Sequence, residues 1–104
     1  MYNIESIQAM YIKRAVEFTQ YFHNRIKERL IKHADIKSAV MNGEIIEQNL
    51  NDLQNPSILI LGYTRNNKPL HIAVGVDDDK IWLITVYYPA PGIWEEDYKR
   101  RKAG

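Results

Sequence analysis

His71 is the residue whose type and setting most clearly suggest chemistry. It lies in residues 70–76, where bulky apolar side chains alternate with a second set made of His71, Ala73 and Gly75. Such alternation is typical of a β-strand that is buried on one face. Small neighbours on the other face leave space around an imidazole, which can act as a general acid or base near neutral pH. The competing interpretation is a packed histidine that is hydrogen-bonded within the core.

The neighbour of His71 across the sheet depends on the turn that precedes its strand. Asn66 and Asn67 are typical of a two-residue hairpin turn, because asparagine tolerates positive φ. With that turn, His71 lies opposite Gly62, and the glycine adds open space beside the imidazole. We therefore expect a groove in the sheet with His71 at its floor.

A second group of candidates lies in the N-terminal half, where His23 is followed by Arg25 and Arg29. Residues four apart share one face of a helix, so two guanidinium groups could hold a phosphate there. His23 would place a proton carrier beside them, as a catalytic residue with Arg25. A solvated basic face with Glu28 nearby is the simpler interpretation of the same residues.

Tyr87 and Tyr88 end the last predicted strand, and as consecutive residues they point to opposite faces of the sheet. A phenol at the rim of the groove could donate a proton or stack on a base. A slip of one residue in the turn at 77–79 exchanges the two faces, so the sequence leaves open which tyrosine lies beside His71. In the other interpretation, both tyrosines are simply packing residues.

The last candidates form a run of cations, and they are Lys99, Arg100, Arg101 and Lys102. Such a run could contact the phosphates of RNA, while the alternative is a solvated tail that pairs with the acidic residues just before it. The spacing of His23, His33 and His71 matches no metal-ligand motif. Residues 77–79 lack the downstream glycine and glutamate of a calcium loop. We therefore expect no metal and no other cofactor.

Helices must position the N-terminal candidates. Apolar residues recur every three or four positions across residues 4–30, which predicts amphipathic helix, with poor helix formers at residues 19–21. One long helix and two helices with a break there both fit this pattern. A further short helix over residues 34–42 ends before Gly43, which is free to take the left-handed conformation that often closes helices.

Strands must position His71 and the tyrosines. Four are expected, at residues 44–47, 57–64, 70–76 and 80–88, with a polar loop at 49–56. Helices followed by antiparallel strands predict an α+β domain whose helices pack on one face of the sheet. The whole chain, 1–104, is assigned to one domain with a helical part at 1–42, a four-stranded, mainly antiparallel sheet at 44–88 and a charged C-terminal tail at 89–104.

The composition excludes several classes of protein. The chain has 104 residues, and 45% of them are hydrophobic, which argues against disorder. Its 14 Lys and Arg are nearly balanced by 13 Asp and Glu, which argues against a strong positive electrostatic field that would attract nucleic acid. It has no cysteine and no long apolar run, which excludes disulfides and a membrane-spanning helix. With no export signal recognised, a cytoplasmic location is expected.

Several blocks of sequence, taken together in order and spacing, resemble the uncharacterised prokaryotic domain-of-unknown-function family numbered 4258. The blocks lie at residues 22–31, 35–39, 42–47, 59–62, 68–72 and 84–87. The resemblance covers roughly residues 18 to 101. It implies a fold similar to the RelE-type and barnase-type ribonucleases, in which helices precede an antiparallel sheet and the concave sheet face holds the active site.

The resemblance also implies an activity. Members of those superfamilies are often toxins of toxin–antitoxin pairs, and they cut RNA without metal by activating the ribose 2′-hydroxyl against the adjacent phosphate. By analogy, His23 or His71 acts as base or acid, Arg25 stabilises the phosphate, and Tyr87 protonates the leaving oxygen or stacks on a base. Arg29 and the run at 99–102 contact RNA, and an antitoxin protein is a further expected partner. The alternative function is a non-catalytic module that binds protein or RNA, in a chain that could form a homodimer.

Overall fold

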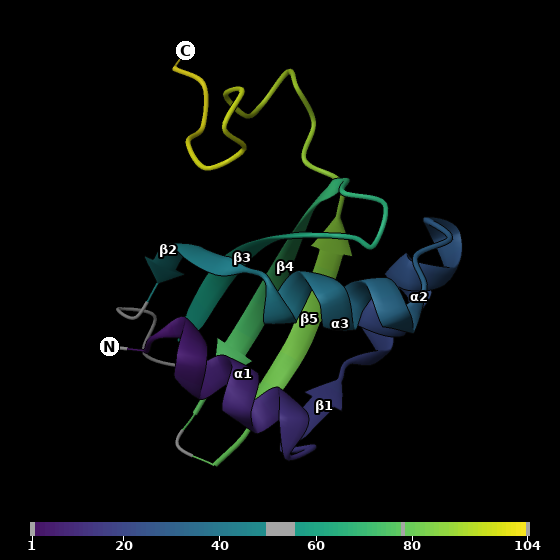
Figure 1. Cartoon of the computed structure of the whole chain (residues 1–104), viewed down its shortest axis with the longest axis vertical. Coiled ribbons are helices and arrows are strands. Elements are labelled where there is room, and N and C mark those ends of the chain that lie inside the picture. Colours follow the sequence, from purple (N-terminus) through teal and green to yellow (C-terminus); the bar gives the residue numbers. More distant parts are fainter. Residues whose placement is uncertain (1, 50–55, 78, 104) are drawn as a thin grey trace.

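The computed structural model describes residues 2–49, 56–77 and 79–103, and it contains one mixed sheet with three helices (Figure 1). Most of the expected 49–56 loop and the middle of the expected 77–79 turn lie outside the described residues. The α+β class is confirmed. The helices and strands are α1 (Ile4–Ile12), β1 (Val16–Phe18), α2 (Gln20–Glu28), α3 (His33–Met41), β2 (Glu44–Asn49), β3 (Ser57–Tyr63), β4 (Pro69–Val76) and β5 (Ile81–Tyr87).

The sheet has five strands in the order β1-β5-β4-β3-β2, so the prediction of four strands was wrong. The additional strand, β1, has only three residues and pairs in parallel with β5. The other neighbouring strands pair in antiparallel fashion. So short a strand, placed between two helices, carries too few residues for an alternating pattern to be seen in the sequence.

The N-terminal apolar pattern belongs to two helices, and the break between them starts earlier than the sequence suggested. The chain leaves α1 at Lys13, and Arg14 takes a left-handed backbone with φ of 64°. It then forms β1 before α2 begins. Thr19 starts α2, because its hydroxyl accepts a hydrogen bond from the backbone N–H of Phe22. The same hydroxyl reaches the carbonyls of Leu83 and Ile84 on β5, at 3.2 and 3.1 Å.

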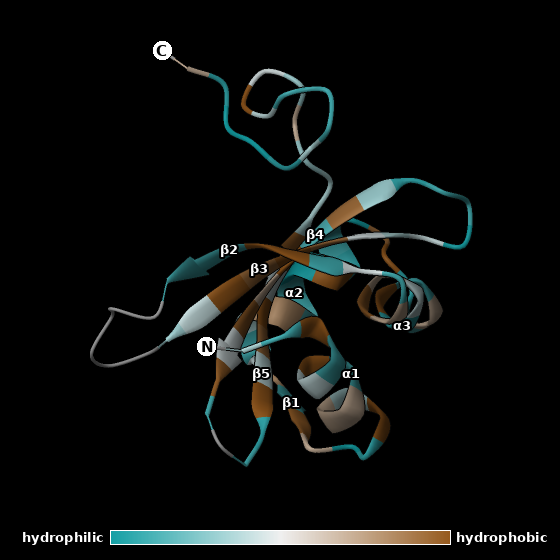
Figure 2. Ribbon diagram, turned by 60° about the vertical axis from the view of Figure 1, so that its left-hand side comes forward, coloured by the Kyte–Doolittle hydropathy of each residue, from teal (hydrophilic) through white to brown (hydrophobic). Residues whose placement is uncertain are grey.

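The hydrophobic core lies between the helices and one face of the sheet, and Figure 2 shows the helices gathered on that side. Phe22 and Ile26 of α2 and Ile36 of α3 are buried there. They pack with the alternate residues Leu70, Ile72, Val74 and Val76 of β4, as the alternation in the sequence predicted. The odd-numbered residues of β4, His71 and Ala73 among them, therefore face the opposite side of the sheet.

The turn between β3 and β4 is longer than expected, and this corrects the predicted neighbour of His71. Thr64 and Lys68 close the loop through a 2.9 Å backbone hydrogen bond, and Asn67 carries the positive φ of 62°. A three-residue loop that ends in a left-handed residue is a common hairpin connection. His71 consequently pairs with Leu61, while Gly62 pairs with Leu70 and points toward the helices.

Two glycines let α3 lie directly against β3. A Cβ on Gly62 would come within 1.9 Å of the Ala39 carbonyl oxygen, and one on Gly43 within 2.5 Å of the same atom. Gly43 follows the helix, as expected, but its backbone is not left-handed, which corrects the prediction of that cap. Asn42 completes the contact, because its side chain accepts from the Tyr63 N–H at 2.8 Å and donates to the Tyr63 carbonyl at 3.0 Å.

Candidate functional site

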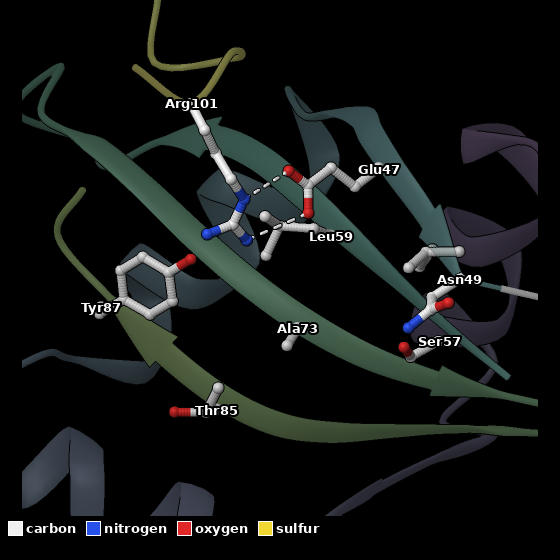
Figure 3. Close-up of a pocket in the computed structure, with 9 residues that line it drawn as sticks. Glu47, Asn49, Ser57, Leu59, Ala73, Thr85, Tyr87 and Arg101 are labelled. Carbon is white, nitrogen blue, oxygen red and sulfur yellow. Dashed lines mark hydrogen bonds and ion pairs between the residues drawn. The ribbon is translucent and has the colours of Figure 1, made fainter. Parts of the chain in front are cut away.

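The sheet face turned away from the helices carries a cleft of about 290 Å³ (Figure 3). Strand register explains its lining. Glu47, Leu59 and Ala73 are consecutive cross-strand partners, and Ala73 pairs with Thr85 of β5. Cross-strand partners point to the same side of a sheet, so these side chains share one surface. The full lining is Glu47, Asn49, Ser57, Ile58, Leu59, Ala73, Thr85, Tyr87 and Arg101.

Glu47 and Arg101 form an ion pair at one end of the cleft, as Figure 3 shows. The guanidinium Nε and one terminal nitrogen of Arg101 donate to the two carboxylate oxygens of Glu47, at 3.1 and 3.3 Å. This bidentate geometry fixes the plane of the guanidinium group. The bonds to Glu47 raise the pKa of Arg101, so the cleft carries a permanent cation beside a carboxylate.

Tyr87 lies beside His71, which settles the question that the sequence left open. The two residues are cross-strand partners, and 3.2 Å separate the phenol oxygen from Nδ1 of His71. Tyr88 points elsewhere and is 43% exposed. Burial raises the pKa of Tyr87, and the carboxylate of Glu47 also raises it, although Arg101 opposes them. The phenol is therefore protonated at neutral pH, within reach of both the cleft and His71.

His71 is fully buried, so it does not lie open at the floor of a groove. Its Nε2 lies 2.7 Å from the backbone carbonyl oxygen of Tyr98, and its ring lies nearly perpendicular to the Trp94 ring, with 4.3 Å between ring centroids. Both contacts come from the C-terminal segment, which we define as residues 89–103. The interpretation as a packed, hydrogen-bonded histidine therefore describes its surroundings correctly.

The C-terminal segment is a folded part of the site and not a free tail. It lies at the end of the sheet where β5 finishes (Figure 1). A bridge between Trp94 and Arg101 closes it into a loop, and the Arg101 guanidinium stacks over the Trp94 ring. Lys99 pairs with Glu44 of β2 at 2.8 Å. The Lys99–Glu44 and Arg101–Glu47 pairs hold the segment on β2, and the contact between the Tyr98 carbonyl and His71 holds it on β4.

Burial of His71 lowers its pKa, and this makes the stability of the protein depend on pH. The folded state keeps the imidazole neutral, whereas the unfolded chain takes up a proton near the ordinary value of about 6.5. The free energy of unfolding is therefore expected to fall as the pH drops from about 6.5 toward the lower pKa of the folded state. Above about pH 6.5 neither state is protonated at His71, and this contribution no longer varies with pH.

Urea unfolding between about pH 7.5 and about pH 5.5 measures this effect. A variant with both His23→Gln and His33→Gln isolates the remaining histidine, and it should keep the decline in stability. A free energy of unfolding that does not change over this range in that variant would show that His71 keeps its ordinary pKa in the folded protein.

The structure does not bring His23 to His71 and Tyr87. His23 lies on α2, beside the ring of Phe18 on β1, and α2 packs on the opposite face of the sheet. Arg25 bonds to Glu28 at 2.7 Å and lies over the ring of Tyr21, with its side chain 23% exposed and its Nε buried. Arg29 donates to the Val86 carbonyl, so the two arginines do not hold a common point.

The C-terminal cations do not form one basic surface. Lys99, Arg100 and Arg101 each pair with a different carboxylate, on Glu44, Asp97 and Glu47 respectively. Lys102 is exposed, and its backbone N–H bonds to the Ile93 carbonyl within the same segment. Arg101 is the one member of the run that lines the cleft.

Across residues 2–49, 56–77 and 79–103, no three His, Asp or Glu side chains gather as a set that could hold a metal ion. No helix formed by those residues has the length and apolar character needed to cross a membrane.

Sequence reasoning did not identify Glu47, Asn49, Ser57 or Thr85 as site residues. The reason for Glu47 is a β-bulge between Ile45 and Glu47, which turns Glu44 and Glu47 to the same side although they are three residues apart. A regular strand would place them on opposite faces. For the other three residues, the only available signal was their position on the same face as His71, which required the register of the whole sheet.

The comparisons with known proteins identify one family. Residues 18–88 match the family described as Domain of unknown function (DUF4258). No curated protein and no solved structure matches the chain significantly. The match begins at Phe18, the last residue of β1, and spans α2 through β5. It stops just after Tyr87, so the C-terminal segment that brings Trp94 and Arg101 to the site lies beyond it. The chain belongs to this family.

Proposed function

We propose that this member of the DUF4258 family is a metal-independent endoribonuclease whose active site is the cleft on the open face of the sheet. The observation that carries the proposal is the shared lining of the cleft by a carboxylate, a guanidinium and a phenol, on Glu47, Arg101 and Tyr87. The relation to the RelE-type and barnase-type ribonucleases is part of the proposal and is consistent with helices on one sheet face and the cleft on the other.

The three groups meet the needs of phosphodiester cleavage by a neighbouring hydroxyl. Attack of the ribose 2′-hydroxyl on the phosphorus requires a group that takes its proton, and negative charge develops on the phosphate oxygens. Arg101 supplies a fixed cation with donors suited to phosphate oxygens. Glu47 and Tyr87 are the groups able to transfer protons beside it. Asn49, Ser57 and Thr85 continue the polar lining along the cleft and can hydrogen-bond a nucleotide.

This assignment replaces part of the site implied by the resemblance. His23, Arg25 and Arg29 have no role in the proposed reaction, because they lie on the helix-covered side of the sheet or are bonded there. Arg101 takes the role given to Arg25, and Tyr87 and His71 keep places in the site. The chain is nearly neutral, so we expect binding of RNA through local contacts in the cleft and not through a broad positive field.

A matched pair of tyrosine variants tests the proposal. The wild-type chain and Tyr88→Phe are expected to cleave total RNA in the presence of a chelator. Tyr87→Phe is expected to cleave about 10²- to 10⁴-fold more slowly, as is usual when a group that transfers a proton is removed. Gel electrophoresis of timed reactions measures the rates. RNA that is bound but not cleaved by the wild-type chain would favour the alternative function, a non-catalytic RNA-binding module.

The alternatives based on protein binding find less support. A binding module requires an exposed apolar patch near Trp94 and Tyr88, and although Tyr88 is 43% exposed, Trp94 is only 3% exposed. A homodimer through the first helix requires an uncovered apolar stripe, but Met10, Tyr11 and Phe18 pack against the core of the same chain. The partners proposed here are therefore RNA and, for a toxin, an antitoxin protein.

A toxin-like role follows if the cleavage acts on cellular RNA, which would place the protein in the cytoplasm. Expression of the wild-type chain is then expected to arrest the growth of a bacterial host, and Tyr87→Phe is expected to restore growth to the level of an empty vector. Growth curves with equal protein levels, checked by immunoblot, measure the effect. Equal arrest by both proteins would mean that toxicity does not arise from the cleft.

A further inference from the structure

The hydrogen bonds of His71 define how its ring is protonated. A backbone carbonyl oxygen only accepts, so the 2.7 Å contact between Nε2 and the Tyr98 carbonyl requires a proton on Nε2. A neutral imidazole carries one proton, and Nδ1 is then an acceptor. The only group that can donate to Nδ1 across the 3.2 Å contact is the hydroxyl of Tyr87. The hydroxyl proton of Tyr87 therefore points at His71.

We propose that His71 is a positioning residue that holds the hydroxyl proton of Tyr87 away from the cleft, so that Tyr87 accepts a proton from the substrate and does not donate one. This inference rests on the proposed function of the cleft. It reverses the role implied by the resemblance, in which Tyr87 protonates the leaving oxygen. The C-terminal segment sets the direction, because it supplies the carbonyl that fixes the proton on Nε2.

The ribose 2′-hydroxyl gives its proton to the Tyr87 oxygen while the Tyr87 proton passes to Nδ1 of His71, so the phenol stays neutral and the imidazole becomes an imidazolium. The 2′-oxygen forms a bond to phosphorus, and the bond from phosphorus to the 5′-oxygen breaks. The 5′-oxygen takes a proton from water, and the hydroxide so formed is neutralised by the extra proton of His71.

The surroundings of His71 favour the transfer of a proton from Tyr87 to His71. Burial is the largest effect on its pKa and keeps the ring neutral before the reaction, while Arg101 acts in the same sense. Glu47 and the Tyr98 carbonyl act in the opposite sense, and both stabilise the imidazolium when it forms. Glu44 and Lys99, the other charged residues where the C-terminal segment meets β2, form an ion pair with each other.

Nitrogen NMR of the full chain tests the protonation state directly, whether or not RNA is cleaved. Labelled histidines are observed in a variant with His23→Gln and His33→Gln, so that the remaining ring signals belong to His71. At neutral pH we expect a protonated Nε2 and a bare Nδ1. Adding Tyr87→Phe to that background should shift the Nδ1 signal to that of an acceptor without a hydrogen bond and leave Nε2 unchanged. A proton on Nδ1, or no response of Nδ1 to Tyr87→Phe, would overturn the inference.

The pH dependence of RNA cleavage by the wild-type chain adds a second readout. If His71 receives the proton, the rate falls at acid pH with a midpoint equal to the pKa of His71 measured by NMR in the same protein. A rate that falls at another midpoint, or that rises as His71 is protonated, contradicts the relay while leaving the cleft as a ribonuclease site. Failure to cleave RNA at any pH overturns both the proposed function and the relay, but the orientation of the Tyr87 hydroxyl is still decided by the NMR result.

Discussion

An Arg101→Gln variant is expected to cleave RNA about 10²- to 10³-fold more slowly than the wild-type chain, which is the usual effect of removing one group that stabilises developing charge. Among the described residues that line the cleft, Arg101 is the only cation. Glutamine is shorter and keeps a hydrogen-bond donor, but it loses the charge and the paired donors. The defect should lie in the rate of cleavage, measured in single-turnover reactions at saturating enzyme.

The neighbouring Arg100 provides a matched control for this prediction. Its side chain is 77% exposed and pairs with Asp97 within the C-terminal segment, outside the cleft. Arg100→Gln removes the same charge one residue along the chain and should leave the cleavage rate within about twofold of wild type, because Arg100 does not line the cleft and its exposed charge is screened by solvent and salt. The Arg101–Glu47 pair is itself partly exposed, so its loss should cost about 1 kcal/mol of stability or less. Equal losses of activity in both variants would mean that total charge, and not the cleft, governs cleavage.

Gly62→Ala is expected to destabilise the protein by about 3 kcal/mol, the upper end of the usual cost of overpacking, even though it adds only one methyl group. The new Cβ would lie 1.9 Å from the Ala39 carbonyl oxygen and 2.6 Å from its Cα, so the backbone of α3 must move off β3. That movement also strains the Asn42 bonds to Tyr63. Backbone strain at the glycine does not contribute, because Gly62 has no positive φ. Urea unfolding followed by circular dichroism measures the loss.

Gly92→Ala separates close packing from the general effect of replacing a glycine. Nothing lies within 4 Å of the position that a Cβ would take at Gly92. This substitution should leave stability unchanged or raise it by up to about 1 kcal/mol, because alanine restricts the unfolded chain. If Gly62→Ala behaved like Gly92→Ala, the close approach of α3 to β3 would not be a determinant of the fold.

The sequence predicted the parts of the fold that follow from local patterning. The alternation in β4 correctly placed Leu70 and Ile72 on the core face and His71 on the other, because period-two patterning reports burial directly. The end of α3 before Gly43 was also predicted correctly. The pairing of His71 was not predicted correctly, because the hairpin loop is one residue longer than expected. The longer loop shifts the register and moves Gly62 to the helix side.

Less of the candidate site could be predicted from the sequence, because contacts between residues far apart in the chain bring it together. Tyr87 meets His71 only through the register of β4 and β5, and Glu47 reaches the cleft only through a bulge in β2. Arg101 comes from a segment that looked like a solvated tail. Its charge run gave no indication that Trp94 would pack on His71 and carry Arg101 to the cleft with it. Glu95, Glu96 and Asp97 were expected to pair with the cations, and one such pair, Arg100 with Asp97, is present.

If RNA in the cleft is cleaved by its own 2′-hydroxyl, cleavage must require that hydroxyl. The wild-type chain is incubated, in the presence of a chelator, with two oligonucleotides of the same sequence. One is RNA, and in the other every 2′-hydroxyl is methylated. The products are analysed by mass spectrometry. We predict that only the RNA is cut, that its fragments carry a 2′,3′-cyclic phosphate, and that Tyr87→Phe forms them far more slowly. Cleavage of the methylated oligonucleotide, or intact RNA after prolonged incubation, would contradict the account.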